Sequence, residues 1–106
     1  MTLGDEELSG PVHWRRTIFD VVDEAYYSHG GLPPGTIGRM FSALDRMRAE
    51  AAEADVIARA EAIAVTLHRL VTTMRAAPRD DEIVKPIRRE LRGMGVAWLN
   101  ETRLSL

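Results

Sequence analysis

The chain has 106 residues, of which 45% are hydrophobic and 28% are charged, and this size and balance fit one globular domain. Its formal net charge of -2 argues against the strong basic field that attracts nucleic acids and anionic membranes. The absence of cysteine excludes disulfides, cysteine-bound metals and a thiol nucleophile, and it is compatible with a reducing compartment.

Residues 1–10 are the expected flexible N-terminus. They carry Asp5, Glu6 and Glu7, where a secretory signal would need a basic region followed by an apolar run. The most apolar stretch, 56–71, is interrupted by charged side chains, whereas a membrane helix needs about 20 mostly uncharged residues. We therefore expect a cytoplasmic protein that does not enter a membrane.

The first helix is predicted to follow Ser9-Gly10-Pro11, because serine caps helices and proline is tolerated in the first turn. It is expected to end at 28–31, since glycine closes helices and Pro33-Pro34 cannot continue one. Its apolar residues recur every three or four positions, which places them on one buried face: Trp14, Ile18, Val21, Val22 and Ala25.

Two apolar stripes follow, and they are out of phase with each other. Thr36 is the expected N-cap of a helix with the stripe Ile37, Met40, Phe41, Leu44 and Met47. The next stripe has the spacing of a bundle seam and predicts a central helix: Val56, Ala60, Ile63, Leu67, Leu70 and Met74. A break at 53–55, with Asp55 as N-cap, would make an antiparallel hairpin; one bent helix from Leu44 to Met74 is the alternative.

The fourth helix is predicted after Pro78, where Asp80-Asp81-Glu82 favours a helix start. Pro86 removes a helical hydrogen bond, so the regular part is expected to begin there, after a separate turn. Gly93 and Gly95 are expected to end it and to leave 96–106 as an apolar C-terminal tail. The sequence thus predicts one all-α domain over 1–106, a small bundle of three to four helices with an antiparallel central hairpin.

No catalytic residue, metal ligand or cofactor is predicted, because His13, His29 and His68 lie in different elements at spacings that suit no metal site. The candidate loop site is Ser28, His29, Gly30 and Gly31. Glycines let a backbone approach a ligand and His29 could exchange a proton, so a small enzyme is one hypothesis and a plain interhelix turn is the simpler one.

Basic residues cluster at one place only, and they form the candidate basic patch: Lys85, Arg88, Arg89 and Arg92. The patch could meet phosphates or an acidic partner, which gives a nucleic-acid-associated regulator as an alternative function. A solvated helix face explains it more simply, because Glu90 interrupts it and the net charge of the chain is acidic.

Large apolar residues in excess of the predicted core are the most informative feature. They form the candidate interface: Trp14, Tyr26, Tyr27, Trp98, Leu99 and Leu104. Such side chains often anchor interfaces, although the tail could instead fold back over its own bundle. We interpret the chain as a protein–protein interaction module without an activity of its own, acting as a homodimer or as an accessory or regulatory subunit of a larger partner.

Part of the chain, less than half, resembles the helical N-terminal part of the nitrile hydratase beta subunit and its accessory proteins. The residues that carry the resemblance are Trp14, Phe19, a helix end at Gly30, and a second helix through Ile37, Arg39, Leu44 and Met47. The resemblance implies a helical partner of a metal-bearing subunit, a partner that does not itself supply metal ligands.

Overall fold

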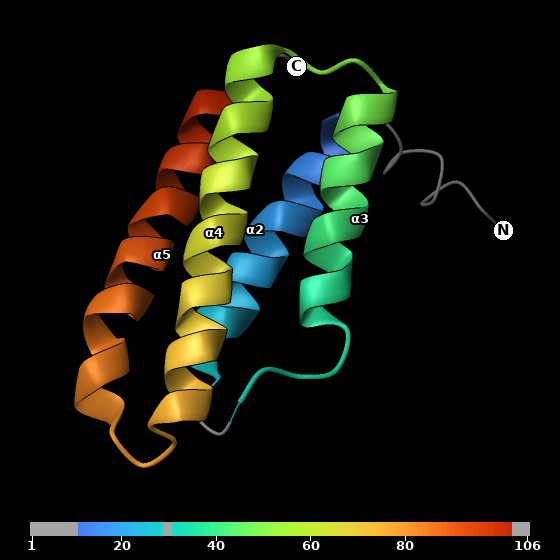
Figure 1. Ribbon diagram of the computed structural model, residues 1–106. Coiled ribbons are helices and arrows are strands. Elements are labelled where there is room, and N and C mark those ends of the chain that lie inside the picture. Colours follow the sequence, from blue (N-terminus) through green and yellow to red (C-terminus); the bar gives the residue numbers. More distant parts are fainter. Residues whose placement is uncertain (1–10, 29–30, 103–106) are drawn as a thin grey trace, which may run out of the picture.

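The computed structural model describes residues 11–28 and 31–102, and all of its regular elements are α-helices. Their bounds are α2 Pro11–Tyr27, α3 Thr36–Ala49, α4 Ala54–Ala76 and α5 Asp81–Thr102. Successive helices run in opposite directions, so the α2–α3 and α4–α5 connections lie at one end of the molecule and the α3–α4 connection at the other (Figure 1). The prediction of a small all-α bundle with an antiparallel hairpin is confirmed.

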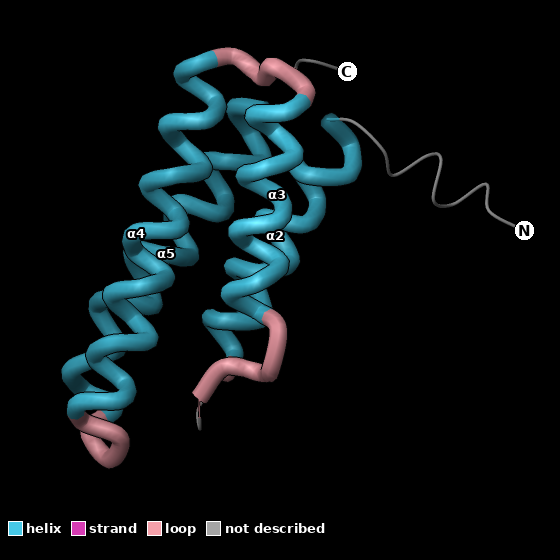
Figure 2. The backbone as a smooth tube through the Cα atoms, turned by 45° about the vertical axis from the view of Figure 1, so that its right-hand side comes forward, coloured by secondary structure: helices cyan, strands magenta, loops and turns pink. Residues whose placement is uncertain are grey.

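The four helices form a ring in which α2 packs against α3 and α5, and α4 packs against α5 and, less extensively, against α3. The α2–α3 pair and the α4–α5 pair diverge toward the end that holds the α2–α3 and α4–α5 connections (Figure 2). The expectation that the third helix is central is therefore wrong, since the core lies between two helix pairs.

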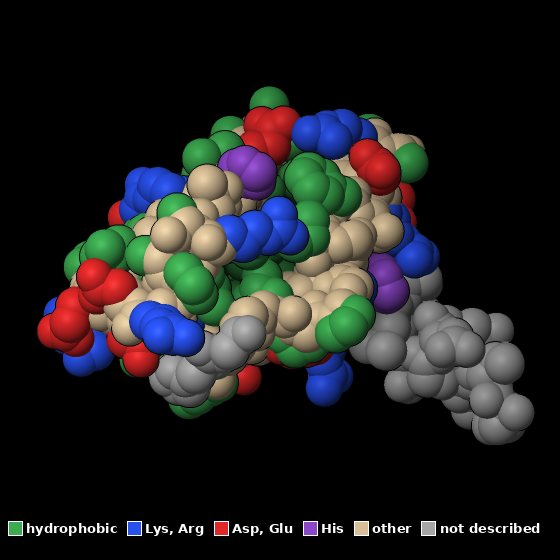
Figure 3. All heavy atoms as spheres, turned by 60° about the horizontal axis from the view of Figure 1, so that its bottom comes forward, with side chains coloured by type: hydrophobic (Ala, Val, Ile, Leu, Met, Phe, Trp, Pro, Cys, Tyr) green, Lys and Arg blue, Asp and Glu red, His purple; other side chains and the backbone are tan. Residues whose placement is uncertain are grey.

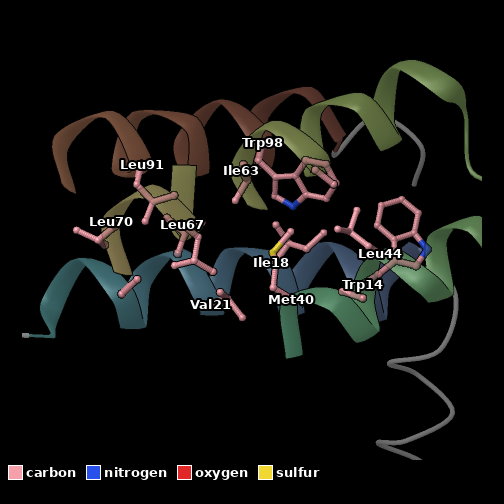
Figure 4. Close-up of a cluster of buried hydrophobic side chains, with 14 of the residues drawn as sticks. Trp14, Ile18, Val21, Met40, Leu44, Ile63, Leu67, Leu70, Leu91 and Trp98 are labelled. Atoms are coloured by element: carbon pink, nitrogen blue, oxygen red, sulfur yellow. The ribbon is translucent and has the colours of Figure 1, made fainter. Parts of the chain in front are cut away.

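The core combines one stripe from each helix. The predicted stripes of α2 and α4 are buried or half-buried, whereas Phe41 of the predicted α3 stripe is 54% exposed and is not a core residue. Trp14 of α2 and Trp98 of α5 meet inside it with ring centroids 6.0 Å apart. Figure 4 shows these indoles beside aliphatic side chains from the other helices. Buried hydrophobic residues include Ile18, Val21, Val22, Ala25, Met40, Leu44, Met47, Ala60, Ile63, Leu67, Leu70, Val84 and Leu91.

The break between the two out-of-phase stripes is a short connection, and the single bent helix is wrong. α3 ends at Ala49, Ala51 takes a left-handed conformation with φ 55°, and α4 begins at Ala54. The predicted N-caps Thr36 and Asp55 are also wrong, and the predicted cap Ser9 lies outside the described residues. Gly35 precedes α3 and Glu53 precedes α4, and neither makes a side-chain capping bond.

α5 is one helix where the sequence predicts a turn, a short helix and a tail. It begins at Asp81 and contains Pro86. Because proline has no N–H, the carbonyl of exposed Glu82 in the first turn lacks its helical hydrogen bond. α5 also continues through both glycines, and Gly95 is buried against α2, where a Cβ would lie 2.6 Å from Val22 Cγ1. Because it has no side chain, Gly95 allows the two helices to approach closely. The predicted tail 96–106 is helical as far as Thr102.

Candidate functional site

A cleft of about 520 Å³ opens at the end of the bundle that holds the α2–α3 and α4–α5 connections, and we call it the end cleft. It lies where the two helix pairs diverge. Figure 3 shows this end, with hydrophobic side chains inside a hollow that charged side chains border. The apolar lining comes from Leu32, Ile37, Val71, Met74 and Val84, and the charged lining from Arg75, Asp80, Asp81 and Arg88.

Arg88 is the buried charged residue of this cleft, with 6% of its surface exposed. It belongs to the inward-facing stripe of α5, four residues after Val84 and three before Leu91. Its Nη1 donates hydrogen bonds to the main-chain oxygens of Ala25 at 3.2 Å and Tyr26 at 3.3 Å, and also to that of Ser28. Because the last carbonyls of a helix have no partner within it, Arg88 caps the C-terminus of α2.

The other terminal nitrogen of Arg88, Nη2, is buried and has no hydrogen-bond acceptor in the described part of the chain. No ion pair among the described residues includes Arg88 either, so its partners at Nη1 are neutral carbonyls. Buried charges in proteins are normally paired, and an unpaired donor costs about 1–3 kcal/mol. Among the described residues, the Arg88 guanidinium therefore has no direct ion-pair partner, although Asp80 and Asp81 also line the cleft.

The N-terminus of α3 forms one wall of the end cleft. Gly35 precedes the helix with φ 88°, and the first turn of α3 contains no acidic residue of its own. The Thr36 hydroxyl bonds to the Pro33 carbonyl at 2.9 Å and to Glu24 Oε1, which links this wall to α2. Hydrogen bonds thus fix the position of the α3 N-terminus relative to Arg88.

The structure brings the predicted loop site and one residue of the predicted basic patch together. Ser28 offers its main-chain oxygen to Arg88, while its hydroxyl donates to the Glu24 carbonyl at 2.7 Å. Gly31 lines the end cleft in a left-handed conformation with φ 116°. His29 and Gly30 lie outside the described residues, so the enzyme hypothesis built on His29 stays a prediction.

The members of the basic patch do not act together, and the solvated face that the sequence predicts is wrong for Arg88 alone. Arg88 faces the interior, whereas Lys85 is exposed and pairs with Glu82 at 2.6 Å. The hydrogen bond from Arg92 to the Tyr27 hydroxyl, 3.3 Å long, raises the pKa of Arg92 above its ordinary value. Of the four cations, Arg89 is the one exposed on α5 for which no ion pair appears among the described residues.

The predicted interface divides into core and surface. Trp14 is 5% exposed and Trp98 is 1% exposed, because the helical continuation of α5 turns Trp98 into the bundle. The two tryptophans are thus core residues of this chain, in agreement with the alternative of a tail that covers its own bundle. Tyr26 and Leu99 are half-buried, Tyr27 is 61% exposed, and Leu104 lies outside the described residues.

A surface along α2 and α5 contains the exposed part of this set. The Arg92 guanidinium lies 4.8 Å from the centre of the Tyr26 ring and 5.8 Å from that of Tyr27. Val96 is 47% exposed one turn after Arg92, and Phe19 is half-buried on the side of α2 that carries Tyr26. We call these five residues the α2–α5 surface. Phe19 and Val96 are not predicted as interface residues, because neither differs in its sequence pattern from core positions.

The chain matches no protein-family model, and the comparisons with curated proteins and with solved structures give no match. The resemblance to the nitrile hydratase beta subunit therefore stays a prediction. Within residues 11–28 and 31–102, no group of three or more histidine or carboxylate side chains is placed to hold a metal ion. None of the four described helices has the length and apolar character needed to cross a membrane.

Proposed function

We propose that the chain is a protein–protein interaction module, a homodimer or an accessory subunit of a larger partner, that binds through the α2–α5 surface. The observation that carries the proposal is the exposed cluster in which Arg92 lies over Tyr26 and beside Tyr27. Tyrosine and arginine are enriched among the residues that contribute most to binding at protein interfaces.

The cluster is held in place before any partner binds, which lowers the entropic cost of association. The Tyr26 and Tyr27 rings contact each other edge to face, with centroids 5.1 Å apart. Arg92 donates to the Tyr27 hydroxyl and lies 3.8 Å from Asp23 Oδ1. Three side chains from two helices thus present a fixed aromatic and cationic surface.

The alternative of a nucleic-acid regulator has less support. Arg88 is buried and Arg92 is engaged with two tyrosines and Asp23, so the face has lost two of its four predicted phosphate contacts. Weak, salt-independent retention on DNA or RNA would agree with this assessment, since phosphate binding falls steeply with salt.

The test is the solution mass of the purified chain across a wide concentration range, by size-exclusion chromatography with light scattering. A homodimer is expected to dissociate at least about tenfold more readily when Tyr27→Ala removes the exposed ring. Val65→Ala is the matched control, because Val65 is 67% exposed on α4, on the opposite side of the ring from α2. Equal effects of the two substitutions would reject the α2–α5 surface.

A monomer at every concentration would reject the homodimer and leave the accessory subunit. A photoreactive amino acid at position 27, compared with one at position 65, then tests that form in the source cells. One discrete cross-linked partner at position 27 alone supports the proposal. Identical products at the two positions, or none at either, refute it.

A further inference from the structure

We propose that the end cleft binds a small monocarboxylate with an apolar body, and that the carboxylate pairs with Arg88. This inference is independent of the proposed function, since the cleft lies at the end of the bundle and does not include the α2–α5 surface. Two observations carry it: the dimensions and lining of the cleft, and the unpaired Nη2 of the buried Arg88 that lines it.

The cleft has the properties of a ligand pocket. Its volume of about 520 Å³ lies within the roughly 300–1,000 Å³ typical of small-molecule sites, which are mostly apolar with few polar groups. Leu32 and Ile37 come from the side of the α2–α3 connection, and Met74 and Val84 from the facing helix pair. An aliphatic or aromatic body between these two walls would remove apolar surface from water on both sides.

Arg88 determines the polar end of the ligand. A guanidinium presents its N–H groups as a planar fork that matches a carboxylate, and charge-assisted hydrogen bonds are stronger than neutral ones. Here Nη1 is occupied by carbonyls of α2, and Nη2 is the nitrogen without an acceptor. A carboxylate oxygen would supply both the missing acceptor and the missing counter-charge.

The charges around the cleft favour one negative charge over two. Arg75 adds positive potential near Arg88, whereas the positive end of the α3 dipole already faces the Glu24 carboxylate that accepts from the Thr36 hydroxyl. Asp80 and Asp81 line the same cleft at the start of α5, where Asp80 Oδ1 accepts a hydrogen bond from the Glu82 amide at 3.1 Å. These carboxylates would repel a phosphate dianion more than a monocarboxylate, so the ligand class is a monoanion.

The experiment titrates the full chain with octanoate and, separately, with 1-octanol, which has the same chain without the charge. The readouts are two-dimensional NMR spectra of the backbone amides and of the arginine side chains. We expect octanoate to shift the Arg88 guanidinium signals together with amides lining the end cleft, and to bind at least about tenfold more tightly than 1-octanol. Equal affinity of the two compounds, or no octanoate binding at about 10 mM, overturns the proposal.

Two glycine substitutions locate the site without disturbing the capping role of Arg88. Gly38 lines the end cleft and Gly93 does not, yet both are exposed helical residues whose Cβ would meet no atom within 4 Å. Gly38→Leu should weaken octanoate binding at least about tenfold by occupying the cleft, while Gly93→Leu leaves it unchanged. Equal affinities for the two variants, with both folded, would show that octanoate binds elsewhere and would refute the assignment.

Discussion

The contact between Gly95 and Val22 predicts different effects for the same substitution at two glycines of α5. An alanine Cβ at Gly95 would lie 2.6 Å from Val22 Cγ1 and 3.3 Å from Val22 Cβ, whereas carbon atoms normally pack at about 3.5–4.0 Å. Val22 is fully buried, and a β-branched side chain on a helix has one strongly preferred rotamer. The two helices must therefore move apart, which costs about 1–3 kcal/mol of the free energy of unfolding.

Gly93→Ala is the matched control, because a Cβ at Gly93 meets no atom within 4 Å. Alanine is favoured over glycine in a helix by about 1 kcal/mol, and both substitutions receive this gain. We expect Gly93→Ala to stabilise the protein by that amount, and Gly95→Ala to be about 1–3 kcal/mol less stable than Gly93→Ala. Urea unfolding measures the difference, and in thermal unfolding each kcal/mol corresponds to about 4–8 °C.

A double-mutant cycle separates the clash from other effects at Gly95. Val22→Ala removes Cγ1, the atom nearest the added Cβ, so the penalty of Gly95→Ala should largely disappear in that background. The reasoning fails if Gly95→Ala stabilises the protein as much as Gly93→Ala does. It also fails if the penalty persists unchanged after Val22→Ala.

Three further predictions concern the cap, the core and the surface. Arg88→Met removes both the donor of the α2 carbonyls and the unpaired Nη2, so the cap is best read locally, as faster amide hydrogen exchange in the last turn of α2. Exposed Arg89→Met should leave that exchange unchanged, and equal rates in the two variants would contradict the capping role. Trp98→Phe should lower the free energy of unfolding by about 2–3 kcal/mol, because it leaves a void and removes the indole N–H that donates to a main-chain carbonyl at 2.9 Å. An unchanged midpoint of urea unfolding would contradict this prediction. The hydrogen bond and the charge of Lys85 hold the pKa of Glu82 below 4.5, so Lys85→Met should raise that pKa in an NMR titration. The ion pair stabilises the fold at pH values above the pKa of Glu82 in the unfolded chain. This stabilisation is lost as the pH falls through the pKa of Glu82 in the folded chain.

Hydrophobic periodicity was sufficient to predict α2, α3, α4 and the hairpin. Extending the stripe of α3 beyond Met47 leads to a different direction from the stripe that begins at Val56, and one straight helix cannot bury both against one core. The observed connection from 50 to 53 resolves this conflict. The phase of an apolar stripe marks the helix face that packs against the core, so a change of phase predicts a change in helix direction.

Rules based on single glycine and proline residues gave wrong helix boundaries where contacts with a neighbouring helix or with water determine the structure. Glycine usually closes a helix, but Gly95 lies inside one because α2 passes too close for a side chain. Proline usually breaks a helix, but Pro86 lies early in α5. There Glu82, whose carbonyl would accept the missing hydrogen bond, is exposed to water. Single-residue rules contain no information about the neighbouring helix, so these boundaries could not be found from the sequence.

The end cleft was only half predictable. The segment 28–31 stands out by composition, but the cleft that Gly31 lines follows from how the helix pairs diverge (Figure 2). Arg88 could have been found, because Val84, Arg88, Leu91, Gly95 and Trp98 recur at spacings of four and three, the pattern of a buried stripe. Its neighbours Lys85, Arg89 and Arg92 are also cations, so by charge alone Arg88 looks like part of an exposed face.

The two roles of Arg88 lead to one physical consequence for the proposed ligand. Arg88 lines the end cleft, its Nη1 closes the C-terminus of α2, and its buried Nη2 has no acceptor among the described residues. A carboxylate that reaches Nη2 would relieve the unpaired charge that the cap requires. A ligand that binds only the folded chain stabilises it by RT ln(1 + [L]/Kd), about 2.7 kcal/mol at a hundredfold excess over Kd. Because Arg88 joins α5 to α2, that stabilisation should appear most strongly as slower amide hydrogen exchange in the last turn of α2, which distinguishes binding at Arg88 from apolar binding elsewhere on the bundle.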